Sequence, residues 1–269
     1  MFEAILIATD DSQLMKNAMK YTANAFPDAK YHILNVINTS DKNIPITNIL
    51  MKDLKKSSKM AIQDGVDILH EMGIHKINKI IRKGTPSKEI IRYAKEKNIE
   101  LIVMGTQSKS GTQTYEIGDT CLHVLEHSPI PVLVFDSIVD IKKPKKLLHP
   151  SSGSKYSLKA GYMAIELVEY FDGKLEVLST RGGSETESTF KKLHDFAEEK
   201  NLKYKLRPCA VKPHEEIVEE SKKYDFMVAS LGRPGLKYEL RKIYPPFAVG
   251  KLEREIIVET RDPILFIED

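Results

Sequence analysis

Short apolar runs alternate with longer amphipathic segments along the first half of the chain. The runs are typical of buried strands and lie at residues 4–8, 31–37, 77–81, 101–104 and 130–135. Apolar positions at helical spacing, with capping residues before them, predict helices at 13–25, 46–72, 86–100 and 119–127. Strands that alternate with helices favour a parallel sheet covered on both faces, because parallel neighbours need crossover connections.

The same order of signals starts again after a short polar linker at residues 141–146. GTPSKEII (84–91) is similar to VKPHEEIV (211–218), ELIVMG (100–105) to DFMVAS (225–230), and PVLVF (131–135) to PILFI (263–267). The matches keep their order and recur after on the order of 125 to 145 residues, which is too long for a solenoid repeat. We therefore expect two copies of one domain, at residues 1–137 and 144–269.

Composition narrows the class of protein without indicating its activity. With 269 residues, 41% hydrophobic and 29% charged, the chain has the make-up of a globular protein, which excludes a disordered or fibrous class. A net charge of +3 does not indicate a nucleic-acid partner, and no run approaches the roughly 18 apolar residues of a membrane span. Two cysteines, Cys121 and Cys209, fit a reducing compartment. We expect a cytoplasmic protein that binds neither nucleic acid nor membrane, with both thiols structural.

Candidate ligand-binding positions follow from the predicted sheet. Ligands of open parallel sheets bind beyond the carboxyl ends of the strands, where Thr9, Asp10, Val36, Gly84 and Gly105 lie. A helix beginning near residue 118 adds unpaired N–H groups and a favourable dipole, so an anion such as a nucleotide fits. The alternative is that these residues only form the turns that any α/β domain needs.

Four segments make the first half resemble a universal stress protein domain. They are ILIATDDS, HILNVI, KGTPSKEII and the run from LIVMG to PVLVF at residues 101–135. The second half resembles the family more faintly, so the whole chain resembles the tandem form. The resemblance implies an α/β fold: two tandem Rossmann-like domains of the adenine nucleotide alpha hydrolase-like type. Each would have three α/β/α layers and a five-stranded, mostly parallel sheet.

The resemblance also implies roles for individual residues. Asp10 would contact the ribose, Val36 and Gly84 would lie by adenine, and Met104, Gly105 and Gln107 would line the nucleotide. The ATP-binding members have Gly, two residues, Gly, nine residues, Gly, then Ser or Thr, and Gly105 and Gly118 match this motif. The complete set of expected nucleotide-binding residues is Thr9, Asp10, Val36, Gly84, Met104, Gly105, Gln107, Ser108, Gly118, Asp119 and Thr120.

Two departures from the motif act against triphosphate binding. Ser108 replaces its second glycine and Asp119 its phosphate-binding hydroxyl, which places a negative charge beside an anion. Asp119 would be tolerated if it held a divalent metal such as Mg²⁺ on the phosphates. In the second half Ser152 replaces the ribose-binding aspartate, and the loop with Gly232, Gly235 and Gly250 has another length. We expect the second domain to be degenerate.

A competing motif suggests a different chemistry. His123 to His127 spells H-x-x-E-H, a zinc-protease signature, although a zinc site needs a third ligand. In the resembled family a basic residue and a His are common in this helix, which favours a structural role.

Two functions from different classes stay open. The first is a stress-response regulatory protein that binds ATP or AMP in its first domain and changes partners, with no catalytic acid, base or nucleophile evident. The alternative is a universal stress protein without nucleotide binding that acts as a protein-interaction module; weak nucleotide hydrolysis is a third hypothesis. The resemblance further implies an intramolecular pseudo-dimer through residues 131–135 and 263–267, an unidentified protein partner, and a homodimer as a further assembly.

Overall fold

The computed structural model describes residues 1–40, 47–106, 117–210, 212–231, 249 and 251–268. The chain separates into two compact units, residues 2–142 and 143–269. The division falls inside the polar linker at residues 141–146. Gln107 and Ser108 lie outside the described residues, as do Gly232, Gly235 and Gly250 of the second half.

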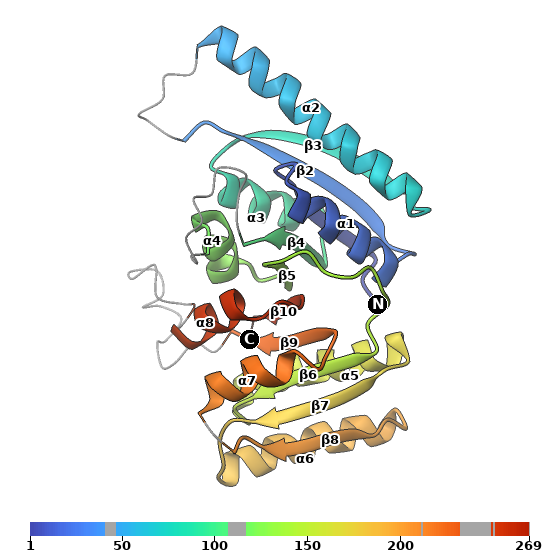
Figure 1. The fold of residues 1–269 in the computed structure, drawn as a ribbon, viewed down its shortest axis with the longest axis vertical. Helices are drawn as coiled ribbons and strands as arrows, with labels where there is room; N and C mark the ends of the chain where they lie inside the picture. Colours follow the sequence, from blue (N-terminus) through green and yellow to red (C-terminus); the bar gives the residue numbers. More distant parts are fainter. Residues whose placement is uncertain (41–46, 107–116, 211, 232–248, 250, 269) are drawn as a thin grey trace. The chain divides into compact units, whose positions relative to one another are not determined.

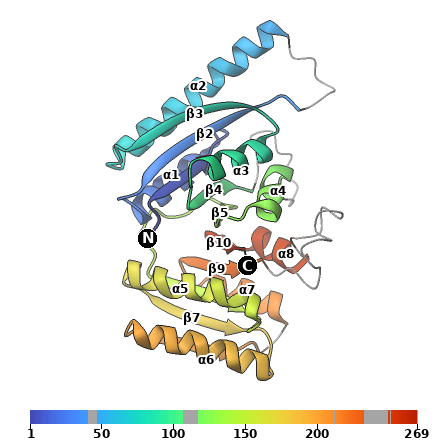
Figure 2. The ribbon, with the colours of Figure 1, turned by 180° about the vertical axis from the view of Figure 1, so that it is seen from behind.

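The first unit is a parallel sheet with helices on both faces (Figure 1). Its strand order is β3-β2-β1-β4-β5, and every neighbouring pair is parallel. Helices α1 and α2 cover one face, and α3 and α4 cover the other (Figure 2). The elements are β1 (Ala4–Ala8), α1 (Gln13–Ala25), β2 (Lys30–Asn38), α2 (Asn48–Glu71), β3 (Ile77–Gly84), α3 (Pro86–Glu96), β4 (Leu101–Gly105), α4 (Asp119–His127) and β5 (Val132–Phe135).

Burial on both faces explains why the central strands are continuous apolar runs. Ile5, Leu6 and Ile7 of β1 have no exposed surface, and neither do Leu101 to Val103 of β4. Consecutive side chains of a strand point to opposite faces, so a strand between two helical layers must be apolar at every position. These runs therefore form the core of the unit.

Several predicted element boundaries were wrong, and for three of them the structure shows the cause. Helix α2 begins at Asn48 rather than Ile46, because the Thr47 side chain accepts a hydrogen bond from Leu50 N and caps the helix. Helix α3 ends at Glu96 rather than near residue 100, since Asn98 has a left-handed backbone with φ of 49°. Strand β3 continues to Gly84 because it pairs with the whole of β2 up to Asn38.

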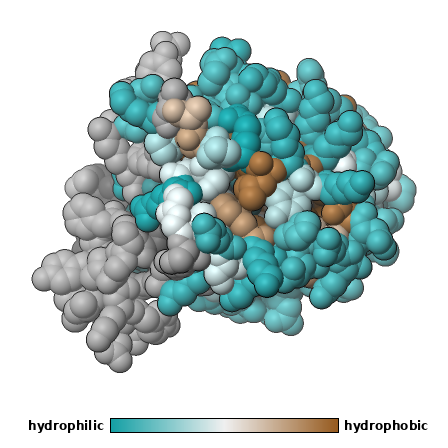
Figure 3. Space-filling view, turned by 90° about the horizontal axis from the view of Figure 1, so that it is seen from below, coloured by the Kyte–Doolittle hydropathy of each residue, from teal (hydrophilic) through white to brown (hydrophobic). Residues whose placement is uncertain are grey.

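The second unit repeats this plan. Its strand order is β10-β9-β6-β7-β8, again with parallel neighbours. The elements are β6 (Lys146–Ser151), a 3₁₀ turn η1 (Lys155–Ser157), α5 (Leu158–Phe171), β7 (Lys174–Ser179), α6 (Ser184–Glu199), β8 (Tyr204–Pro208), α7 (Pro213–Ser221), β9 (Phe226–Ser230), α8 (Lys251–Glu259) and β10 (Ile264–Ile267). When the molecule of Figure 1 is viewed from below, the surface is mostly hydrophilic, with a small group of hydrophobic residues near the centre of the view (Figure 3).

The segments that match in sequence occupy equivalent places in the two units. Strand β4 lies between β1 and β5, as β9 lies between β6 and β10. Pro86 opens α3 and Pro213 opens α7, each in the first turn of its helix. The prediction of two copies of a Rossmann-like three-layer domain is confirmed at the level of the fold.

Candidate functional site

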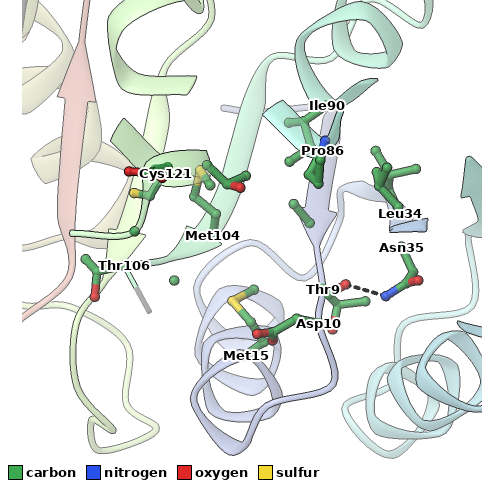
Figure 4. Close-up of a pocket in the computed structure, with 16 residues that line it drawn as sticks. Thr9, Asp10, Met15, Leu34, Asn35, Pro86, Ile90, Met104, Thr106 and Cys121 are labelled. Atoms are coloured by element: carbon green, nitrogen blue, oxygen red, sulfur yellow. Dashed lines mark hydrogen bonds between the residues drawn. The ribbon is translucent and has the colours of Figure 1, made fainter. Parts of the chain in front are cut away.

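A cavity of about 360 Å³ opens at the carboxyl ends of β1 and β4 in the first unit. Beyond these strands the chain turns into helices α1 and α4, so loop backbone and helix starts surround the opening. Figure 4 shows the lining side chains, with Asp10 and Met15 beside each other and Pro86 and Ile90 together elsewhere on the wall. The cavity lies where parallel sheets bind their ligands.

The loop after β1 fixes Asp10 at the rim. Its side-chain Oδ1 accepts a hydrogen bond from Ser12 N at 3.0 Å, while Thr9 Oγ1 accepts one from Asp11 N at 3.1 Å. Asp11 has a left-handed backbone with φ of 66°, which turns the chain sharply into α1. Asn35 of β2 donates from Nδ2 to the Thr9 carbonyl at 2.8 Å (Figure 4). The β1–α1 turn is thus held by hydrogen bonds from its own side chains and from β2.

The start of helix α4 forms another part of the lining. Gly118 is its N-cap, and within the described chain no side chain caps this helix. Gly118 N donates to the Thr106 carbonyl at 2.7 Å, and a Cβ on Gly118 would lie only 2.9 Å from the same oxygen. Only glycine allows this approach. The first N–H groups of α4, which have no partner inside the helix, therefore border the cavity.

Two carboxyl groups and a buried thiol lie at the α4 end of the cavity. Asp119 lines the cavity at the first position of α4, where its carboxylate faces the positive end of the helix dipole. Below it, Thr106 Oγ1 donates a hydrogen bond to Asp136, whose pKa is raised by burial and partly lowered again by this bond. Cys121 is buried, and burial together with the charge of Asp136 raises the pKa of its thiol to about 12. At neutral pH Cys121 is a protonated thiol in the wall and not a nucleophile.

Most of the expected binding residues border this one cavity. Gly84 does not belong to its described lining; it ends β3 with φ of 141° and lies against the Glu89 side chain. Gln107 and Ser108 lie outside the described residues. The expected residues that line the cavity are Thr9, Asp10, Val36, Met104, Gly105, Gly118, Asp119 and Thr120.

The sequence patterns missed the apolar walls of the cavity. Pro86 and Ile90 reach it from α3 and Met15 reaches it from α1, and their helical spacing had indicated only core packing. Among the missed residues, Asn35 could have been found from the sequence, because a polar residue inside the apolar run of β2 needs a partner or a ligand. The other missed lining residues are Ala8, Leu34, Thr106 and Cys121.

The corresponding loop of the second unit is closed by its own contacts. Ser152 stands where Asp10 stands in the first unit, and its Oγ lies 2.9 Å from Ser154 Oγ. A Cβ on Gly153, whose φ is 65°, would lie 2.4 Å from Cγ2 of Thr186 in α6. Helix α6 therefore packs directly onto this loop.

The H-x-x-E-H segment forms part of helix α4. The rings of His123 and His127 are stacked with centroids 4.0 Å apart, and His127 Nδ1 lies 2.9 Å from the His123 carbonyl oxygen. Among the described residues, no three His, Cys, Asp or Glu side chains are grouped to hold a metal ion.

Within the same residues, no helix is both long and apolar enough to cross a bilayer.

Comparison with known proteins identifies the family. The family model described as "Universal stress protein family" matches residues 1–136. The chain belongs to the universal stress protein family.

Two curated relatives and one solved structure illustrate the match. Universal stress protein MJ0531 of Methanocaldococcus jannaschii is 31% identical over 160 residues, which cover 54% of this chain and 85% of the relative. Universal stress protein YxiE of Bacillus subtilis is 26% identical over 147 residues, 50% of this chain and 99% of the relative. A universal stress protein structure from Archaeoglobus fulgidus aligns with 98% of this chain. The alignment covers 96% of that protein's chain, with a TM-score of 0.80 and 18% sequence identity. That last likeness shows a shared fold over both units.

Proposed function

We propose that this universal stress protein is a stress-response regulator that binds an adenine nucleotide, ATP or AMP, in the cavity of its first unit. The observation that supports this function best is the combination, in one cavity, of an anchored aspartate and a helix start that no side chain of the described residues caps. Asp10 lies at one side, and the first turn of α4 lies at another. A carboxylate that accepts hydroxyl hydrogen bonds suits a ribose, and free helix N–H groups suit a phosphate.

The cavity also fits the base in character and size. Val36, Ile90 and Met104 supply apolar contact surface of the kind that a flat heteroaromatic base needs. The volume of about 360 Å³ lies within the range of roughly 300 to 1,000 Å³ typical of small-molecule sites. The proposed activity is binding without turnover; the described lining offers two carboxylates, Asp10 and Asp119, and the protonated thiol of Cys121.

Asp119 favours AMP over ATP unless a cation intervenes. Its carboxylate lines the cavity beside the helix N–H groups that would receive a phosphate. Each further negative charge on the ligand is repelled by about 1 kcal/mol at 4 Å in water, and by more where water is excluded. A divalent cation such as Mg²⁺ between Asp119 and the phosphates would reverse this effect.

Calorimetric titration of the full chain with AMP and with ATP, each with and without Mg²⁺, tests the proposal. Asp10→Ala is expected to weaken binding of both nucleotides about tenfold or more, because a hydrogen bond to a charged group is lost. Asp119→Ser is expected to strengthen ATP binding about fivefold in the absence of Mg²⁺. Ser152→Ala, at the equivalent position of the second unit, is the matched control and is expected to leave affinity unchanged.

The second candidate function is a protein-interaction module without nucleotide. Asp119 in the cavity and the closed loop of the second unit favour it. If neither AMP nor ATP binds the wild-type chain with or without Mg²⁺, the titration rejects nucleotide binding and supports this alternative.

A further inference from the structure

A second cavity lies at the opposite end of the sheet of the first unit. Its volume is about 540 Å³, and it is lined where β1, β2 and β3 begin and where α3 ends. Because the strands are parallel, their amino ends share one edge, away from the Asp10 cavity at their carboxyl ends. None of its described lining residues belongs to the Asp10 cavity.

Three polar side chains form a hydrogen-bonded chain in the floor of this cavity. His32 Nδ1 lies 2.7 Å from Tyr93 Oη, and Asn78 Nδ2 lies 3.1 Å from His32 Nε2. The side chains of His32 and Tyr93 are buried, with 4% of the surface of each residue exposed. A buried polar chain of this kind must satisfy its donors and acceptors within itself or with a ligand.

The hydrogen-bonded chain has a spare donor in either tautomer of His32. If Tyr93 donates to His32 Nδ1, then Nε2 carries the hydrogen, and the Asn78 amide must be turned so that its oxygen accepts from Nε2–H; the Asn78 N–H groups are then left to donate. If His32 Nδ1–H donates to Tyr93, then the Tyr93 hydroxyl has its own hydrogen left to donate. The floor therefore suits a ligand that accepts hydrogen bonds.

Lysine ammonium groups add positive charge to the wall. Lys30 at the start of β2 and Lys97 at the end of α3 line the cavity, and neither side chain has a hydrogen bond or ion pair with any described residue. The described lining contains no Asp or Glu. Burial, followed by repulsion from Lys30 and Lys97, lowers the pKa of His32 to about 4, so His32 is neutral at pH 7.

We propose that this cavity binds a phosphate group, either inorganic phosphate or the phosphate monoester of a small metabolite, between Lys30 and Lys97 with the His32–Tyr93–Asn78 chain as floor. A phosphate monoester carries a charge of about −1.5 to −2 at pH 7, which matches two ammonium groups. Neutral donors below the two cations complete the set of hydrogen bonds that phosphate oxygens accept. The volume of the cavity also falls in the range of small-molecule sites.

A purely structural role explains less of what is observed. A His–Tyr–Asn chain can tie β2 and β3 to α3, but it does not require two unpaired ammonium groups beside a neutral histidine. Other cations of the first unit that lie near buried polar groups are paired: Lys16 with Asp11 and Asp64, and Arg82, which lies over the Tyr93 ring, with Glu89 and Glu96. An anionic ligand would give Lys30 and Lys97 a negatively charged partner, as carboxylates do for Lys16 and Arg82.

Nuclear magnetic resonance of the histidine side chains in the full chain tests this site locally. The ¹H–¹⁵N signal of the His32 imidazole, assigned with His32→Gln, is followed while inorganic phosphate is added at constant pH and ionic strength. We expect a saturable shift of this signal. In the double variant Lys30→Met/Lys97→Met the affinity is expected to fall about tenfold or more, because charge-assisted hydrogen bonds are lost. Both lysines are on the surface, so circular dichroism is expected to show an intact fold.

Matched controls separate specific binding from general salt effects. The double variant Lys55→Met/Lys56→Met removes two exposed ammonium groups from α2 and is expected to keep the wild-type affinity. Sodium chloride is expected to give no saturable shift of the His32 signal. The proposal is overturned if phosphate gives no saturable shift, if chloride gives the same shift, or if the Lys30/Lys97 variant binds phosphate as the wild type does. Because phosphate at the α4 start would not reach His32, this result is independent of nucleotide binding.

Discussion

Gly118 shows how one atom decides the geometry of the Asp10 cavity. A Cβ at this position would lie 2.9 Å from the backbone carbonyl oxygen of Thr106, which cannot move as a flexible side chain could. We predict that Gly118→Ala destabilises the chain by about 1–3 kcal/mol and weakens nucleotide binding, because the start of α4 must shift. Urea unfolding measures the first effect. Gly182→Ala, where an added Cβ meets nothing within 4 Å, is the control, and equal losses in both variants would refute the packing argument.

His149 makes the stability of the protein depend on pH. It lies fully buried in β6, where its Nδ1–H donates to the Val228 carbonyl at 2.8 Å, and burial lowers the pKa of its imidazole from 6.5 to about 4. Between these two values the unfolded chain binds the proton and the folded chain does not. Stability from this histidine is therefore complete above pH 6.5 and is lost as pH falls toward 4.

The variant His149→Asn isolates this contribution. The asparagine amide reproduces the Nδ1–H donor but does not titrate, so we predict a shallower loss of unfolding free energy between pH 6.5 and 4 than in the wild type. Carboxyl groups titrate in both proteins and cancel in the comparison. Denaturant unfolding at a series of pH values provides the measurement. Parallel pH profiles would show that His149 is protonated in the folded state.

At the scale of elements, an arginine at the end of the edge strand ties that strand to the following helix in both units. Arg82 of β3 pairs with Glu89 and Glu96 of α3. Arg207 of β8 pairs with Glu216 and Glu220 of α7, and also with Glu176 of β7, its Nε lying 2.6 Å from Glu176 Oε1. Repetition of this arrangement supports duplication of the domain more strongly than the short sequence matches do.

We predict that Arg207→Met lowers the unfolding free energy by about 2–4 kcal/mol. Its three carboxylate partners are largely buried, so removal of the cation takes away the countercharge that they share, although Lys205 still pairs with Glu176 and Lys223 with Glu220. Lys222→Met, which removes an exposed i,i+3 pair with Glu219 on α7, is the control and is expected to cost at most about 0.5 kcal/mol. Thermal and urea unfolding compare the two variants. Similar losses would show that the network around Arg207 contributes no more than a surface pair.

The elements could be predicted from the sequence because most of them show a pattern within a short stretch of chain: an apolar run for a strand, or a capping residue before an amphipathic run for a helix. The strands at Ala4–Ala8 and Leu101–Gly105 are apolar throughout, and α1 and α4 have a capping residue or glycine before an amphipathic run. One boundary was wrong because the deciding contact is not local. Strand β3 extends through polar residues to Gly84 because its partner β2 extends to Asn38.

The candidate sites were predictable only in part, for the same reason. Residues that follow strands, such as Asp10 and Gly118, are marked by their place in the pattern. The apolar wall from Pro86 and Ile90 depends on how α3 packs over the sheet. The cavity with His32, Asn78 and Tyr93 depends on the register of β2 with β3 and was not predicted.

In the whole molecule, the two units differ in the residues that follow their first strands. Both have the universal stress protein fold, but only the first combines an aspartate after its first strand with an open cavity among the described residues. In the second, Ser152 and the contact of Gly153 with Thr186 replace that arrangement. Duplication followed by loss of one site predicts one nucleotide per chain rather than two.

Native mass spectrometry of the full chain with saturating AMP or ATP and Mg²⁺ tests this central claim most directly. We predict a mass increase of one nucleotide per chain, absent or strongly reduced in Asp10→Ala and unchanged in Ser152→Ala. Two bound nucleotides per chain, or one that persists in Asp10→Ala and disappears in Ser152→Ala, would contradict the assignment of the site to the first unit. No bound nucleotide under any of these conditions would contradict nucleotide binding itself.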